Sequence, residues 1–184
     1  SGGPPQFRTA NSGTTQWSLL GQYARLNYNY KGKYLLNAAM RRDGSSRFGA
    51  DDRWGSFPSL SLGWVVTEEN FAKNAGPLNY LKLRAGYGVT GNFNIGDFRQ
   101  YANIGQDNYP INQEIAIGRP IVSLGNSLLT WETTKGINLG ADMGWLNDRI
   151  VFSFDYYDKT TEGLLYNLEI PTSSGFGSVM SNIG

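Results

Sequence analysis

Alternation of apolar and polar side chains with a period of two is the feature that most constrains this chain. Between Lys33 and Trp64, two alternating runs flank a polar, glycine-rich loop. One face of these runs carries Tyr34, Leu36, Ala38 and Met40, then Leu60, Leu62 and Trp64. Successive side chains of a β-strand point to opposite faces, so each run predicts a strand with one apolar face and one polar face. Such strands suit a wall between lipid and water.

The same period recurs along the chain and predicts six strands, with a seventh beginning near its end. The expected strands cover residues 17–30, 33–42, 58–66, 80–89, about 134–145 and 150–156, the last continuing over 164–168, and 178–184. Thr67 is expected to cap a short helical turn after the third strand. From Thr90 to about Leu128 no period is sustained, which predicts a long loop with a function of its own.

Short and long connections alternate along this series of strands. Residues 31–32, 67–79 and 146–149 make short or compact connections, and Gly32 supplies the positive φ that a tight turn needs. The loops after Arg42, Val89 and Tyr157 are long. Up-and-down strands place every second connection on the same side, so one rim has short turns and the other has long loops. Outer-membrane barrels have this asymmetry, with the short turns at the periplasm.

The two faces predict different surroundings. Charged and amide side chains are expected to face the lumen, namely Arg25, Arg41, Arg84, Asn138 and Asp142. Aromatic residues beside the short turns predict a girdle at the periplasmic interface, made by Tyr30, Tyr34, Trp64 and Trp145. The alternative is that aromatic residues are simply favoured in strands.

Aromatic residues also occur in the expected outer loops. Phe48, Trp54, Tyr101 and Tyr109 are candidates to stack on sugar rings or peptide side chains of a substrate, or to contact a partner. The alternative is that they pack the loops against one another.

Composition excludes several function classes. The chain has no Cys and no His, which removes thiol nucleophiles, imidazole bases and the usual zinc ligands. Its net charge of +1 does not favour nucleic-acid binding. Its mean hydropathy of −0.39 is compatible with a barrel, whose inward face is polar.

Neither glycines nor carboxylates predict catalysis. Residues 86–91, GYGVTG, match a dinucleotide-binding pattern, but a loop follows where that mechanism needs a helix. We therefore attribute Gly86 and Gly88 to a crowded inward face. The acidic pairs at 51–52 and 68–69 and the acidic residues between 155 and 162 lack the spacing of a glycosidase or calcium site. No catalytic set, metal site or cofactor site is expected.

Several segments resemble the SusC/RagA-like family of TonB-dependent outer-membrane transporters of Bacteroidota. They are DGSSRFG and RWGSFPSLSLGW within residues 41–64, LKLRAGYGVTGN at 81–92, LTWETTKGINLGADMGWLNDRI at 129–150 and DYYDKTTEGLL at 155–165. These motifs occur in the family's order and cover nearly the whole chain.

The resemblance implies an all-β, antiparallel transmembrane barrel in the outer membrane of a Gram-negative bacterium. It implies a 22-stranded barrel, of which residues 1–184 supply about six or seven strands, without the plug domain or the remaining strands. Energy would come from TonB through the absent plug, a SusD-like surface lipoprotein would be the partner, and oligosaccharides or peptides would be the substrate. The alternative function is a soluble β-sandwich module that binds glycans, which the alternation and exposed aromatics would also serve.

Overall fold

The computed structural model describes residues 14–72, 76–97, 99–111 and 114–184, and their regular structure is strands with two short 3-10 helices. The strands are β1 (Leu19–Tyr30), β2 (Tyr34–Ser45), β3 (Trp54–Val65), β4 (Leu78–Asn92), β5 (Asn103–Ile104), β6 (Asp107–Ile111), β7 (Glu114–Gly118), β8 (Ile121–Ser123), β9 (Glu132–Trp145), β10 (Ile150–Glu162), β11 (Leu164–Glu169) and β12 (Ser178–Ile183). The 3-10 helices are η2 (Val66–Glu68) and η3 (Thr172–Ser174). Within these ranges no helix has the length and apolar character needed to cross a membrane.

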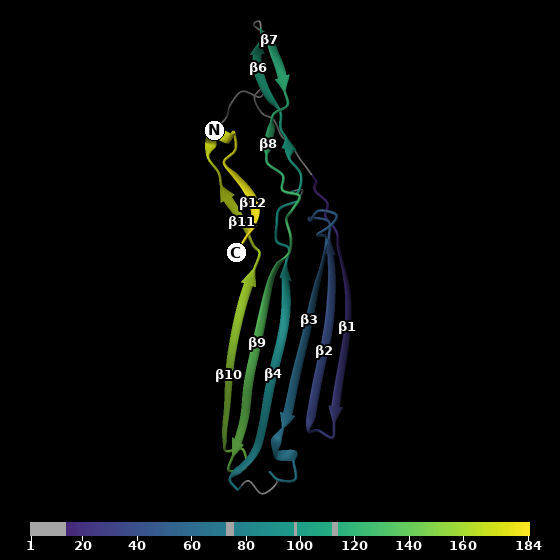
Figure 1. Ribbon diagram of the computed structural model, residues 1–184, viewed down its shortest axis with the longest axis vertical. Coiled ribbons are helices and arrows are strands. Elements are labelled where there is room, and N and C mark those ends of the chain that lie inside the picture. The colour runs from purple at the N-terminus through teal and green to yellow at the C-terminus, as the bar shows by residue number, and fades with distance from the viewer. Residues whose placement is uncertain (1–13, 73–75, 98, 112–113) are drawn as a thin grey trace, which may run out of the picture.

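A six-stranded antiparallel sheet forms the body of the molecule, in the order β1-β2-β3-β4-β9-β10. Figure 1 shows these long strands side by side, with the short connections at one end and the long ones at the other. We call these the short-turn end and the loop end. The predicted alternation of connection lengths therefore corresponds to two different rims of the sheet.

The register keeps the two faces continuous across all six strands. One row of directly opposite residues runs through Leu36, Leu62, Ala85, Leu139 and Tyr156. The adjacent row runs through Asn37, Ser61, Gly86, Asn138 and Tyr157. Because a shift of one residue would exchange the faces, this parity gives the sheet one apolar face and one polar face.

No second sheet covers the apolar face among the described residues. Leu26, Leu62 and Phe154 stay 60%, 48% and 55% exposed on it. A β-sandwich buries such side chains between its two sheets. The described residues therefore do not form the β-sandwich that the alternative function requires.

Several strand bounds and the long loop differ from the sequence prediction. β2 runs on to Ser45 and β3 begins at Trp54, because these residues still pair across the two strands. The segment between β4 and β9 is not a structureless loop, since it contains the pairs β5–β8 and β6–β7. β11 does not continue β10 in the sheet, because Gly163 adopts a φ of +63° and β11 pairs instead with β12.

At the short-turn end, the β1–β2 turn and the turn containing η2 are formed by local backbone geometry and hydrogen bonds. Lys31 and Gly32 have φ of +54° and +70°, which closes the predicted tight turn between β1 and β2. Thr67 does not cap η2, because the residue before this helix is Val65 and makes no side-chain capping hydrogen bond. The Thr67 hydroxyl instead accepts a 3.3 Å hydrogen bond from the Leu81 amide.

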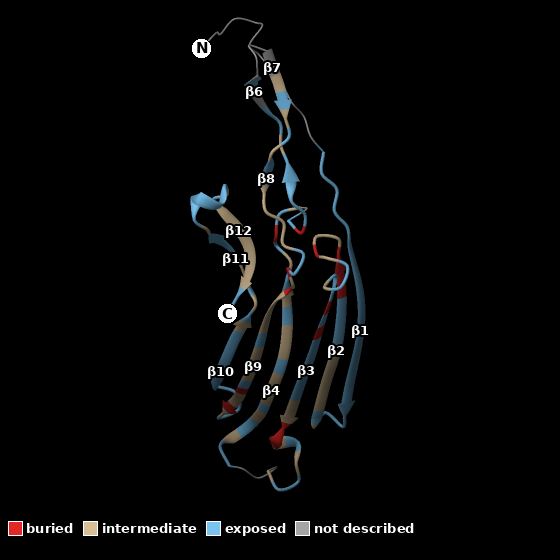
Figure 2. Cartoon of the chain, turned by 45° about the horizontal axis from the view of Figure 1, so that its top comes forward, coloured by how far each residue is buried: buried red, intermediate tan, exposed pale blue. Residues whose placement is uncertain are grey.

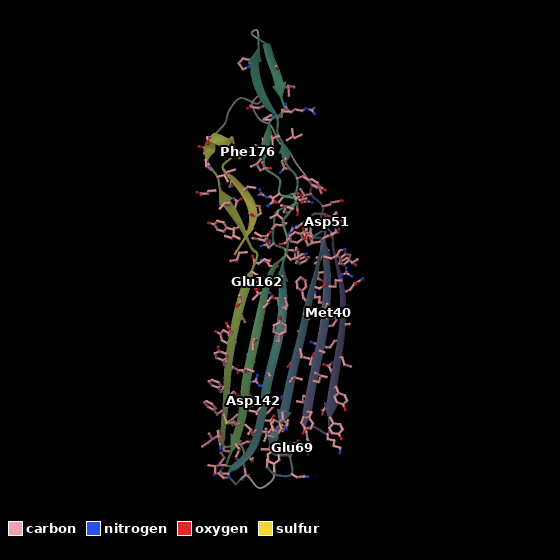
Figure 3. All side chains as sticks on the ribbon, viewed as in Figure 1. Met40, Asp51, Glu69, Asp142, Glu162 and Phe176 are labelled. Atoms are coloured by element: carbon pink, nitrogen blue, oxygen red, sulfur yellow. The ribbon has the colours of Figure 1, made fainter. Side chains whose placement is uncertain are left out.

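Glu69 joins the turn after η2 to the start of β2. The Tyr34 hydroxyl donates to its carboxylate at 2.7 Å, and the Lys33 ammonium donates at 3.0 Å. Figure 3 shows Glu69 at the short-turn end of the sheet. The Tyr34 hydrogen bond, followed by the Lys33 contact, holds the pKa of the Glu69 carboxyl below its ordinary value of 4.5.

The facing of the sheet predicts unequal effects of charge at two neighbouring positions. Leu139→Arg places a guanidinium on the face predicted to meet lipid, and we expect it to destabilise the protein by about 2 to 4 kcal/mol. Asn138→Arg puts the same group on the polar face and should have a small effect. Refolding titrations into lipid or detergent measure both, and equal losses would contradict the assignment of the faces.

The Glu69 contacts predict a pH-dependent stability. Because the folded-state pKa is the lower one, ionised Glu69 stabilises the fold fully above pH 4.5, and this is lost as the pH falls through the folded-state pKa. The gap in melting temperature between the wild type and Glu69→Gln should thus be constant from neutral pH to about pH 5 and shrink below that. Glu68→Gln, at an exposed position in the same turn, is the control. A gap that is unchanged at pH 3 would contradict the lowered pKa.

Candidate functional site

The polar face carries a charge network near the short-turn end. Arg84 of β4 donates to both oxygens of Asp142 on β9, at 2.8 and 3.0 Å. Its guanidinium also lies 3.1 Å from the Asp155 carboxylate on β10. A Cβ at Gly140 would come within 2.8 Å of both Arg84 and Asp155, so glycine is what allows the cation to lie between the two carboxylates. The network therefore ties three neighbouring strands together on one face.

Above this network, the polar face is less fully neutralised. Arg41 of β2 pairs with Asp43 at 2.7 Å, whereas Arg25 of β1 forms no ion pair within the described residues. Arg25, Arg41, Arg84, Asn138 and Asp142, which were expected to face the lumen, do lie on one face of the sheet. That this face lines a lumen remains a prediction.

Crowding by neighbouring atoms was expected to explain Gly86 and Gly88 of β4, but the described structure has room for a side chain at both positions. A Cβ at Gly86 would meet no atom closer than 3.8 Å, and one at Gly88 none closer than 3.7 Å. Crowding therefore does not explain these glycines, and the prediction of a crowded inward face is wrong for the described part of the chain. Their effect is a stretch of sheet without side chains. The GYGVTG motif has no helix after it, since β4 simply continues to Asn92.

At the loop end, the connections fold together around a small core. Its buried members are Phe48, Phe57, Ile95, Leu129 and Trp131. The Trp131 ring is central, with centroid distances of 5.1, 5.3 and 5.6 Å to Phe48, Phe57 and Phe93. In Figure 2 most of the buried segments lie where the long strands meet the loops. We call this the loop core.

Hydrogen bonds fix the β11–β12 hairpin to the loop core. The Asn182 side chain accepts from the Thr130 amide at 2.9 Å and donates to the carbonyls of Thr130 and Gly163 at 3.0 and 2.8 Å. Asn126 donates to the Met180 carbonyl at 3.0 Å. These amide side chains satisfy backbone groups that have no ladder partner, so the hairpin is held in one position.

Arg47 connects three further segments of the loop end. Its guanidinium lies 2.8 Å from Asp97 and stacks 4.4 Å from the Trp17 ring centroid and 5.8 Å from that of Phe93. The side chains of Arg47 and Asp97 are only 15% and 19% exposed. Residues near 17, 47 and 95 are thus joined by one cation. No periodic pattern in the sequence predicts this contact or the central position of Trp131.

Phe48 is not available as a substrate contact. It is 1% exposed and packs against Trp131, because β2 and β3 bring the DGSSRFG loop over the core. Phe48 therefore packs the loops against one another, as the alternative interpretation predicts.

The other loop candidates have separate environments. Trp54 is 41% exposed, lies opposite Gly44 on the apolar face and carries the Arg42 guanidinium 4.9 Å from its ring. The Trp54 side chain therefore does not lie on the polar face. Tyr101 is 62% exposed, and the side chain of Tyr109 lies outside the described part of the chain. Substrate contact by Tyr101 and Tyr109 remains a prediction.

The expected girdle residues share the apolar face near the short-turn end. Tyr30 and Tyr34 stack with ring centroids 6.4 Å apart, and Tyr34 lies opposite Trp64. Trp145 is on the same face at the end of β9. Their position at a membrane interface remains a prediction.

The acidic residues noted in the sequence do not form a site. Within the described ranges, no group of three or more carboxylates could hold a metal ion. Asp158 lies on the apolar face and Asp155 on the polar face, while Glu162 pairs with Lys135 at 2.6 Å. Asp142 and Glu162 are well separated along the sheet in Figure 3.

Comparison with known proteins shows which family has this sheet and these loops. The family model described as "TonB dependent receptor-like, beta-barrel" matches residues 1–184. The chain is 47% identical over 180 residues to TonB-dependent receptor P39 of Formosa agariphila, and 42% identical over 188 residues to TonB-dependent receptor SusC of Bacteroides thetaiotaomicron. Each match covers 97% of this chain but only 17% and 18% of the relative. The chain thus spans less than a fifth of their length.

Solved structures agree with the sequence matches. The RagAB peptide transporter superposes with a TM-score of 0.81 at 32% identity, covering 91% of this chain and 18% of that one. The RagAB peptide importer in its closed-closed state gives a TM-score of 0.82 at 29% identity, covering 98% of this chain and 21% of that one.

The loop core predicts which substitution loosens the loops without opening the sheet. Phe48→Ala removes a ring that is packed on Trp131, and we expect a loss of about 3 to 5 kcal/mol in the local stability of the loop end. Hydrogen exchange in residues 45–53 and 93–131 measures it, with β1 and β10 unchanged. Tyr101→Ala, at an exposed ring, is the control and should change exchange little. Equal exchange in Phe48→Ala and the wild type would contradict the loop core.

Proposed function

Because this chain belongs to the TonB-dependent receptor-like β-barrel family, we propose that it forms part of the wall of an outer-membrane transporter that imports oligosaccharides or peptides. The observation that carries the proposal is the parity of the six-stranded sheet. No described residue covers its apolar face, and its polar face holds ionised groups, as a lipid-spanning wall around an aqueous lumen requires. Relatives are named as receptors and transporters rather than enzymes.

In this proposal the loop end lies outside the cell and the short-turn end lies in the periplasm. The shortness of the turns at one rim supports this orientation, as does the cluster of Tyr30, Tyr34 and Trp64 beside them. The folded loop end, with its own core and amide network, would present a fixed surface to solute or to a partner.

We further propose a SusD-like surface lipoprotein as the partner and TonB as the energy source. The likeness to SusC and to the two-component RagAB assembly supports the lipoprotein. TonB would act through a plug domain of the full-length receptor. Loop rigidity favours docking, because a surface that is already ordered loses little conformational entropy on binding.

Uptake by the full-length receptor tests this function. We expect cells that express the receptor with its lipoprotein to take up a labelled oligosaccharide or peptide mixture, and cells with inactive TonB to take up at least about tenfold less. The receptor should fractionate with the outer membrane and purify together with the lipoprotein. Recovery in the soluble fraction, or uptake that does not need TonB, would contradict the proposal.

A further inference from the structure

A groove of about 430 Å³ lies on the apolar face of the sheet, next to the short-turn end. Its walls are apolar-face side chains of four consecutive strands, namely Tyr28, Tyr34, Leu36, Leu62, Trp64, Leu83 and Ala85. Leu35, Gly63 and Arg84 complete the lining. These three belong to the row in between, whose side chains point to the polar face, so the floor of the groove is backbone.

A small residue makes this hollow. Ala85 lies opposite Leu62 on one side and Leu139 on the other. Its same-face neighbours along β4 are the larger Leu83 and Tyr87. Leu62, Leu83 and Tyr87 stay 48%, 40% and 43% exposed, so no described side chain fills the space above the alanine methyl group.

Tyrosine rings connect the groove to the tight turn between β1 and β2. Tyr30 stacks on both tyrosines of the groove, with its ring centroid 6.5 Å from that of Tyr28 and 6.4 Å from that of Tyr34. The Lys31 ammonium lies 5.2 Å from the Tyr30 centroid. Lys31 therefore places a positive charge at the short-turn end of the groove.

The other cation beside the groove is already neutralised. Lys33 pairs with Glu69 at 3.0 Å, and the Tyr34 hydroxyl donates to the same carboxylate at 2.7 Å. Glu68 is exposed in the same turn, but no ion pair joins it to Lys31 in the described ranges. The end of the groove thus combines aromatic rings with one cation, which suits an anionic lipid headgroup at a membrane interface.

The proposed wall leaves this groove accessible from the membrane. The four strands that frame it are paired with one another from β1 to β4 and lie side by side (Figure 1). Because the polar face would line the lumen, the plug and the transported solute would lie on the other side of the sheet. The groove would therefore open to lipid near the periplasmic interface.

We infer that this groove holds an anionic phospholipid of the periplasmic leaflet. The inference rests on the proposed function and names a lipid partner of the wall. The upper part of one acyl chain would lie in the groove, and the headgroup phosphate would bond Lys31. Bulk lipid is as apolar as the groove, so the preference comes from packing on several sides of the chain and from the headgroup contact.

The fluorescence of Trp64 tests the inference, because this ring lines the groove. The full-length receptor is reconstituted in phosphatidylcholine vesicles, to which phosphatidylglycerol with brominated acyl chains is added in increasing fractions. Subtracting the emission of Trp64→Phe isolates the Trp64 signal. We expect half-maximal quenching at a fraction about fivefold lower for brominated phosphatidylglycerol than for brominated phosphatidylcholine.

Two substitutions at the groove have matched controls. Ala85→Phe fills the hollow and should remove most of the preference for phosphatidylglycerol. Ala38→Phe makes the same change at the next apolar-face position of β2 beyond Leu36, outside the groove, and should keep the preference.

Lys31→Gln should bring the two lipids to equal quenching. Arg149→Gln removes an exposed cation from the β9–β10 turn at the same end of the sheet and should keep the preference. Melting temperatures establish that each variant is folded.

Three results would overturn the inference. They are equal quenching by both lipids in the wild type, an undiminished preference in Ala85→Phe, and protection of Trp64 from both lipids, which would place a second copy of the receptor on the groove. In each case, outer-membrane fractionation and TonB-dependent uptake by the wild type would still support the proposed transport function. Failure of the lipid site and failure of the function are thus told apart.

Discussion

The shared register of one antiparallel sheet underlies the whole structure. Each of six strands is paired without exchanging its faces, so Leu139 and its neighbours stay on one side and Arg84 and its neighbours on the other. The bulge between Leu78 and Tyr80 is confined to the short-turn end, where it leaves the rest of the β4–β9 register intact. A single-residue slip elsewhere would expose charge on the apolar face and cost several kcal/mol per charged group.

The sheet was predictable from the sequence because its physics is local and periodic. Residues 137–145 alternate so regularly that the strand and its two faces follow from the period alone. The loop end was not predictable in this way, because Phe48, Leu129 and Trp131 meet through contacts far apart in the chain. The resemblance identified the family, yet it did not reveal that Phe48 is buried or that Asn182 and Asn126 support the β11–β12 hairpin.

The candidate site was likewise predictable only in part. The period located the residues of the polar face, but it treated their charges as one mixed set. The structure separates them into a neutralised network around Arg84 and the cations Arg25 and Lys159, which form no ion pair among the described residues. That distinction depends on which strands are neighbours, and the pairing of β4 with β9 across a long intervening segment is not encoded in any local pattern.

This pairing also has a consequence for how the protein folds. β4 and β9 are neighbours in space, although the segment from Phe93 to Trp131 separates them in the chain. Closing such a long loop is entropically unfavourable, and the cost grows with the logarithm of its length. The pairs β6–β7 and β5–β8 lie within this segment, and Trp131 at its C-terminal end packs against Phe93 at its N-terminal end and against Phe57 of β3. These contacts join the two ends of the segment, so the loop core supports the pairing of β4 with β9 as well as the surface of the loop end.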